Sequence, residues 1–138
     1  MNSGQKIDLK IIGYINTFEK ITKIHPIEFK ENNGQLVFIV KEDQVKKAVG
    51  KGGINIKKLS NLFNKRIKVV EYSKNPEKFF LNLIHPIIVK TMELTETQLL
   101  IRPDSIEDKS KIIGKNGKNL EFINSLMYQH HKTKIRMA

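Results

Sequence analysis

The sequence contains no cysteine, which excludes disulfide bonds and thiolate metal sites. It has no apolar run of membrane-spanning length, and its N-terminus lacks a signal-peptide pattern. We therefore expect a soluble, cytoplasmic protein with no membrane partner. Acidic residues are few, since 14 Asp and Glu oppose 25 Lys and Arg, and the formal net charge is +11. A basic excess of this size favours a polyanionic partner.

Residues that could carry catalysis are also scarce. The four histidines form two His-Pro pairs, at His25 and His85, and the adjacent pair His130-His131. The His-Pro pairs fall at expected element boundaries, and a histidine in the last turn of a helix is favoured by the helix dipole without any ligand. No carboxylate pair and no nucleophile next to a base stands out. We expect a protein that is not an enzyme and holds neither a metal nor a cofactor.

The positive charge is concentrated in the first half of the chain. Residues 1–74 hold 15 basic and 7 acidic residues, whereas residues 75–138 hold 10 and 7. Between Gln44 and Val70 there are eight basic residues and no acid. An acid-free run of this kind is better evidence for a polyanion than the overall charge, because solvated lysine faces are common.

A stretch of nine residues occurs twice in the chain. The copies are residues 48–56, AVGKGGINI, and residues 112–120, IIGKNGKNL, and their first glycines are 64 positions apart. A tetrapeptide that also repeats, Ile-His-Pro-Ile at residues 24–27 and 84–87, has a spacing of 60. These matches predict two copies of one small domain, residues 1–74 and residues 75–138. Asn75 and Pro76 are suited to begin the first helix of the second copy.

Each repeat places Gly-Lys-x-Gly between two expected helices. Glycines permit positive φ and have no Cβ, so a ligand backbone can approach closely. The second helix presents its positive dipole end at the turn, and the lysine adds a full charge. The alternative is that the glycines only form a tight helix–helix turn. Neither copy has the spacing of a nucleotide-binding P-loop or of G-x-G-x-x-G.

The hydrophobic pattern predicts the same element order in both halves. In the first half, a helix from Lys6 ends before His25-Pro26, and strands follow near residues 27–30 and 36–40. A short helix leads to Gly50, a second helix follows the loop, and a strand closes the domain near residues 67–69. In the second half we expect a helix from Pro76, strands near residues 87–93 and 98–101, two helices around Gly114, and a strand at residues 134–137. The fold class is α+β.

The repeated stretch resembles the signature of the KH domain, an RNA-binding module whose G-x-x-G loop clamps about four nucleotides. The wider sequence is similar to the archaeal NusA-like transcription termination and antitermination factors, including their inter-domain segment, which residues 69–73, residues 75–79, Asn82 and Pro86 resemble. This resemblance implies two tandem type II KH domains, each with a three-stranded sheet packed against three helices. The residues expected to contact RNA are Val49, Gly50, Lys51, Gly52, Gly53, Ile56, Lys57 and Lys58 in the first domain and Ile113, Gly114, Lys115, Asn116, Gly117, Lys118 and Leu120 in the second.

Several points stay open at the level of the sequence. The four apolar candidates, Val49, Ile56, Ile113 and Leu120, fit the family's base-binding groove, and the alternative is that they belong to the core. The resemblance implies single-stranded RNA as the partner, with RNA polymerase as a further one, and a monomer that modulates elongation or termination. The rival interpretations are a ribosome-associated KH protein that binds rRNA and a protein-interaction scaffold.

Overall fold

The computed structural model describes residues 8–138 and divides the chain into two compact units, with the division between Val70 and Glu71. Unit 1 extends to Val70 and unit 2 begins at Glu71. The elements of unit 1 are α1 (Leu9–Thr22), β1 (Glu28–Asn32), β2 (Gln35–Val40), α2 (Val45–Val49), the 3-10 turn η2 (Lys51–Gly53), α3 (Ile54–Phe63) and β3 (Arg66–Glu71). Those of unit 2 are α4 (Pro76–Ile84), β4 (Val89–Leu94), β5 (Gln98–Pro103), α5 (Ile106–Ile113), η3 (Lys115–Gly117), α6 (Lys118–His131) and β6 (Lys134–Met137).

This order confirms the α+β fold class, with one three-stranded sheet in each unit. The predicted start of the first helix, at Lys6, lies outside the described residues. Asp8 caps α1 instead, because its carboxylate accepts hydrogen bonds from the backbone N–H groups of Lys10 and Ile11.

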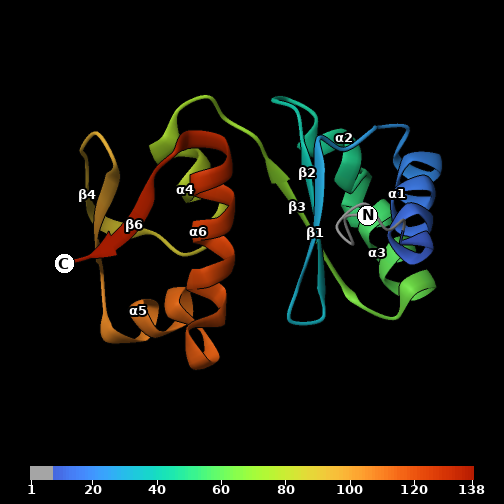
Figure 1. The fold of residues 1–138 in the computed structure, drawn as a ribbon. Helices are drawn as coiled ribbons and strands as arrows, with labels where there is room; N and C mark the ends of the chain where they lie inside the picture. Colours follow the sequence, from blue (N-terminus) through green and yellow to red (C-terminus); the bar gives the residue numbers. More distant parts are fainter. Residues whose placement is uncertain (1–7) are drawn as a thin grey trace, which may run out of the picture. The chain divides into compact units, whose positions relative to one another are not determined.

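In unit 1 the helices lie against one face of the sheet, whose strand order is β1-β2-β3 (Figure 1). The rings of Phe18 on α1 and Phe38 on β2 stack with their centroids 4.1 Å apart. Ala48 of α2 and Leu59 of α3 are fully buried in the same core, so both helices beside the first glycine loop are anchored. The buried members of this core are Tyr14, Phe18, Ile24, Leu36, Phe38, Val40, Ala48 and Leu59.

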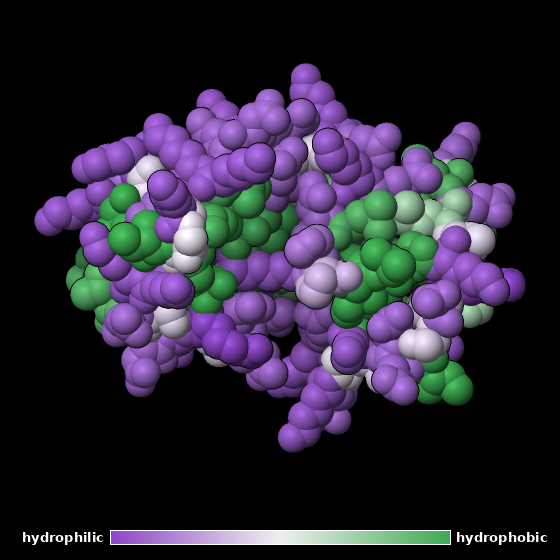
Figure 2. Space-filling model, turned by 180° about the vertical axis from the view of Figure 1, so that it is seen from behind, coloured by the Kyte–Doolittle hydropathy of each residue, from purple (hydrophilic) through white to green (hydrophobic). Residues whose placement is uncertain are grey.

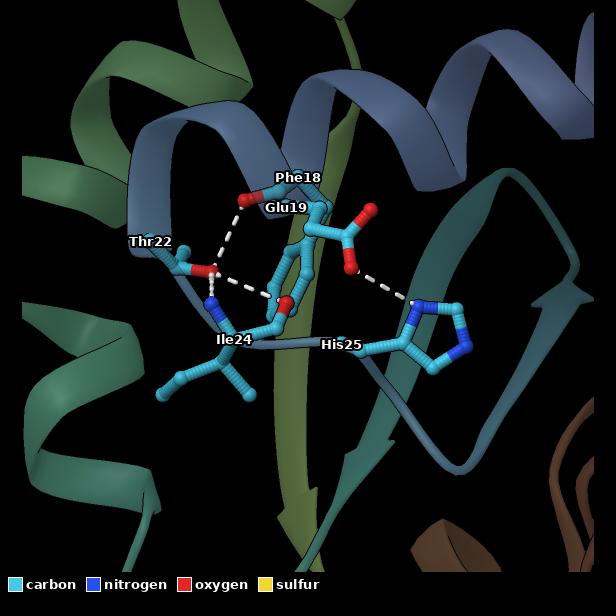
Figure 3. Close-up of polar contacts among 5 residues, drawn as sticks. All are labelled: Phe18, Glu19, Thr22, Ile24 and His25. Atoms are coloured by element: carbon cyan, nitrogen blue, oxygen red, sulfur yellow. Dashed lines mark hydrogen bonds and ion pairs between the residues drawn. The ribbon is translucent and has the colours of Figure 1, made fainter.

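The C-terminal end of α1 is fixed by a buried threonine (Figure 3). The Thr22 hydroxyl donates to the Phe18 carbonyl at 2.8 Å and accepts from the Ile24 N–H at 3.1 Å. These two bonds tie the last turn of α1 to the segment that follows it. One turn away, His25 Nδ1 lies 2.9 Å from Glu19 Oε2 at the surface. The last turn of α1 therefore has a defined position.

Unit 2 has a mixed sheet. β4 and β5 are antiparallel, with Met92 opposite Ile101, whereas β5 and β6 are parallel, with Leu99 opposite Ile135. A parallel pair requires a crossover connection, and here α5, η3 and α6 provide it. The second glycine loop is thus the turn in the middle of a crossover whose helices are held by the buried Ile112 and Ile123.

The segment before α4 packs within unit 2. The Tyr72 ring lies 5.3 Å from that of Phe79 and stacks parallel to that of His131 at 5.9 Å, measured between centroids. The Ser73 carbonyl accepts a hydrogen bond of 2.9 Å from His131 Nε2. Asn75 caps α4 as expected, because its side chain accepts from the Lys78 N–H at 2.9 Å. The domain boundary expected between residues 74 and 75 stays a prediction.

Hydrophilic residues cover most of the face drawn in Figure 2, and hydrophobic residues surface between them in separate areas. Large apolar side chains exposed in unit 1 include Ile54 and Leu62 on α3. Within residues 8–138, no helix combines the length and the apolar character that crossing a membrane requires.

Candidate nucleic-acid interface

The two glycine loops have the same backbone shape. The first glycine of each is at positive φ with extended ψ: φ is 82° and ψ 163° at Gly50, and the values are 75° and 173° at Gly114. The third position is left-handed in both, at Gly52 (64°, 19°) and Asn116 (57°, 24°). Asparagine is among the few residues that tolerate this region, so the loops differ in sequence without differing in conformation.

Besides its positive φ, the first glycine of each loop is required because there is no room for a Cβ atom at that position. A Cβ added to Gly50 would lie 2.9 Å from Asn55 Cγ, and one added to Gly114 would lie 2.6 Å from Asn119 Cβ. The start of the second helix therefore passes directly over the first glycine. A side chain at that position would push the two helices apart.

The paired asparagines Asn55 and Asn119 hold this arrangement. Asn55 Nδ2 donates to the Lys47 carbonyl at 3.2 Å, and Asn119 Nδ2 donates to the Ile112 carbonyl at 2.9 Å. These carbonyls belong to the ends of α2 and α5, where helices leave such groups without partners. Each asparagine therefore ties the helix after the loop to the helix before it. The repeat of asparagine at this position reflects the shape of the loop.

The surface of each loop is positively charged. Lys51 and Lys115, the second residue of each loop, are exposed. No side chain caps the N-terminus of α3 or α6, because the N-cap residues are Gly53 and Gly117. The positive dipole end of each helix is thus open beside a lysine, which is the arrangement that binds phosphate groups.

The apolar candidates lie beside the loops and are only partly buried. Val49 and Ile56 in unit 1, and Ile113 and Leu120 in unit 2, are all of intermediate exposure. Next to the first loop is an open depression of about 420 Å³, lined by Val45, Lys46, Val49, Gly50 and Lys51. Val49 therefore contributes an apolar wall to this depression, next to a glycine and a lysine.

Val45 and Lys46 were not among the expected contact residues. The signal for Val45 was present in the sequence, because residues four apart lie on one face of a helix, and Val45 and Val49 have that spacing. The sequence gives no comparable signal for Lys46. Only the structure shows that its side chain lines the depression beside the loop.

The basic residues of the acid-free run are not equivalent. Lys57 and Lys58 in unit 1, and Lys118 in unit 2, are exposed beside the loops. Lys65 instead lies 3.5 Å from Glu31 Oε2. Lys68 on β3 is half-buried, and this burial lowers the pKa of its ammonium group. The lysines beside the loops are thus better placed for phosphate than the two near or on β3.

Nothing in the described part of the chain adds a metal centre to this site. Within residues 8–138 no group of three or more His, Cys, Asp or Glu side chains is arranged to hold a metal ion.

Comparisons with known proteins give the family. Residues 16–77 match the model of the NusA-like second KH domain. The chain is 33% identical over 127 residues to the probable transcription termination protein NusA of Methanocaldococcus jannaschii, covering 89% of this chain and 69% of that protein. It is 30% identical over 122 residues to the protein of the same name from Methanococcus vannielii, covering 84% and 69%. The crystal structure of APE1850 aligns with a TM-score of 0.69 and 31% identity, over 96% of this chain and all of that one. The chain therefore belongs to the archaeal NusA-like family of proteins with tandem KH domains.

Proposed function

We propose that both glycine loops hold the sugar-phosphate backbone of one single-stranded RNA, and that the chain thereby modulates transcription elongation or termination on nascent RNA. Membership of the family makes the chain an RNA-binding NusA-like factor and not an enzyme.

The observation that carries the proposal is the shared geometry of the two loops. Both keep the same backbone dihedral angles, an exposed lysine at the second position and a helix N-terminus without a side-chain cap. A turn that only joined two helices would need the glycines, but it would need neither the lysine nor the open helix end. The retention of all three features in both units favours a common anionic ligand.

Single strands suit this surface better than a duplex. In KH domains the loop holds the backbone while unstacked bases lie against aliphatic side chains beside it. Val49 and Ile56 supply such side chains at the first loop, and Ile113 and Leu120 at the second. We assign these four residues, the loop residues, and Lys57, Lys58 and Lys118 to the RNA surface.

The biological role is taken from the family. The relatives from two methanogens are named probable transcription termination proteins. By this likeness we propose that the chain acts as a monomer in the cytoplasm, on nascent transcripts, with RNA polymerase as a further partner.

Binding of single-stranded RNA by loop variants tests the proposal. The pair Lys51→Asp and Lys115→Asp changes one exposed residue in each loop. A matched control, Lys41→Asp with Lys90→Asp, makes the same change of charge at exposed positions on or beside strands away from the loops. We expect binding of a randomised single-stranded RNA pool to be lost in the loop pair and largely kept in the control. Equal losses in both pairs would contradict a role for the loops.

A further inference from the structure

A second basic groove lies between α1 and α3, outside the residues assigned above except for Lys58. The two helices lie side by side in unit 1 (Figure 1). The groove between them has a volume of about 540 Å³ and is lined by Thr17, Lys20, Ile21, Lys23, Lys58 and Leu62. It thus combines three lysines, one hydroxyl and two aliphatic side chains, and no acid.

The three lysines of this groove form no ion pair with any side chain of residues 8–138. Lys20, Lys23 and Lys58 are exposed, and the ion pairs formed within residues 8–138 involve none of them. The acid nearest in sequence, Glu19, is paired with His25 (Figure 3). Three unpaired cations around one groove create a positive potential that attracts an anion.

The floor of the groove is apolar and open to solvent. Leu62 exposes 64% of its surface. Ile21 lies beside it and is partly buried. An aliphatic floor bordered by cations suits a ligand that has flat apolar groups on a charged backbone.

The groove is continuous with the first glycine loop along α3. Ile54, Lys58 and Leu62 are spaced by four residues and therefore form one stripe on this helix. Ile54 begins the stripe next to the loop, because its Cγ2 lies 2.9 Å from the place of a Cβ on Gly50. Lys58 and Leu62 end the stripe inside the groove.

The sequence repeats place apolar residues of unit 2 opposite the three lysines of this groove. The repeated Ile-His-Pro-Ile tetrapeptide aligns Lys20 with Phe80 and Lys23 with Leu83, which are both buried. The repeated loop aligns Lys58 with Phe122. In this register the buried face of α1 (Tyr14, Phe18, Thr22) does not correspond to that of α4 (Phe79, Phe80, Leu83, Ile84), so the groove is described for unit 1 alone.

We infer that the α1–α3 groove extends the RNA site of unit 1. An RNA strand held at the first loop continues along α3, and its phosphates contact Lys58, Lys20 and Lys23. One of its bases lies against Ile21 and Leu62. This inference rests on the proposed function of the loops. Two observations favour RNA over an acidic protein segment as the occupant, namely the continuity with the loop and the alternation of cations with aliphatic surface.

The experiment compares two lengths of RNA in a salt series. A KH loop clamps about four nucleotides, so an RNA of about four nucleotides reaches the loop only, and one of about twelve reaches the groove as well. The test variant is Lys20→Gln with Lys23→Gln, which leaves the loop and Lys58 intact. The control is Lys10→Gln with Lys41→Gln, two exposed lysines outside the groove.

The groove variant should bind the short RNA as the wild type does. For the long RNA it should lose about two phosphate contacts, which lowers the slope of log affinity against log salt by about 1.4. Between about 50 and 200 mM salt its affinity should then fall about 7-fold less than that of the wild type. An unchanged salt slope in the groove variant, or an equal change in the control, would overturn the inference. Polyglutamate serves as an acidic polypeptide probe. If the groove variant abolishes polyglutamate binding while its RNA slope stays normal, the inference is overturned as well. If the loop variants leave the short RNA bound, the proposed function fails instead.

Discussion

Replacing the first glycine of a loop by alanine should have a cost that differs between the two units. At Gly114 the atoms that an added Cβ would meet are Asn119 Cβ at 2.6 Å and the Asn119 backbone nitrogen at 3.0 Å. At Gly50 they are Asn55 Cγ and Ile54 Cγ2, both at 2.9 Å and both parts of side chains. Side chains move more easily than backbone, so Gly114→Ala should be the more disruptive change.

The magnitude follows from two contributions. Alanine at the dihedral angles of Gly114, φ 75° and ψ 173°, costs on the order of 1–3 kcal/mol. Displacing Asn119 also breaks its hydrogen bond of 2.9 Å to the Ile112 carbonyl, which is worth about 1 kcal/mol. We therefore expect Gly114→Ala to lower the free energy of unfolding of unit 2 by about 2–4 kcal/mol. Gly117→Ala should cost only about 1–2 kcal/mol, because a Cβ there meets nothing within 4 Å.

Amide hydrogen exchange in the full-length protein gives the measurement for each unit separately, because the protection of core strands and helices reports the free energy of opening. Exchange should accelerate more in residues 71–138 of Gly114→Ala than in the same residues of Gly117→Ala. Gly52→Asn in unit 1 is the matched control and should leave protection within about 0.5 kcal/mol of wild type, since Asn116 already occupies the corresponding position. Equal effects of Gly114→Ala and Gly117→Ala would refute the reasoning from close packing.

Two further predictions concern charge. The pair Lys51→Asp and Gly52→Asp should weaken RNA binding more than Lys115→Asp with Asn116→Asp, because residues 1–74 carry most of the basic excess; filter binding that gives the reverse order would reject this ranking. Burial lowers the pKa of His131 below its ordinary value of about 6.5. The unfolded chain therefore binds more protons than the folded chain near that pH. The stability of unit 2 should consequently fall as the pH drops below about 6.5. Thermal unfolding across this range should show a weaker pH dependence in His131→Gln, and an unaltered dependence would remove His131 as its cause.

The sequence predicts the loops and the order of elements well because these depend on local patterns. The glycines of each loop and the cap at Asn75 are short-range signals, and the structure agrees with both. Alternating burial is seen in β5 and β6, whereas β2 is buried from Leu36 to Val40 without alternation. The positive φ at Gly50 and at Gly114 belongs to the same class of signal.

Contacts that depend on tertiary structure were not predictable in this way. The bond from Asn55 to the Lys47 carbonyl crosses the loop, and a helix-start asparagine gives no indication of that partner. The hydrogen bond between His131 and Ser73 joins residues 58 positions apart. The α1–α3 groove likewise brings Lys20 and Lys58 together only after both helices have packed on the sheet.

The central claim is that both loops contact the same RNA, and the most direct test is to follow backbone amide resonances as single-stranded RNA is added. We predict that the signals of residues 50–56 and of residues 114–120 shift together, and that duplex RNA at the same concentration leaves both sets in place. Shifts confined to other surfaces, or equal shifts with duplex RNA, would contradict the claim and leave the glycines as turns between helices.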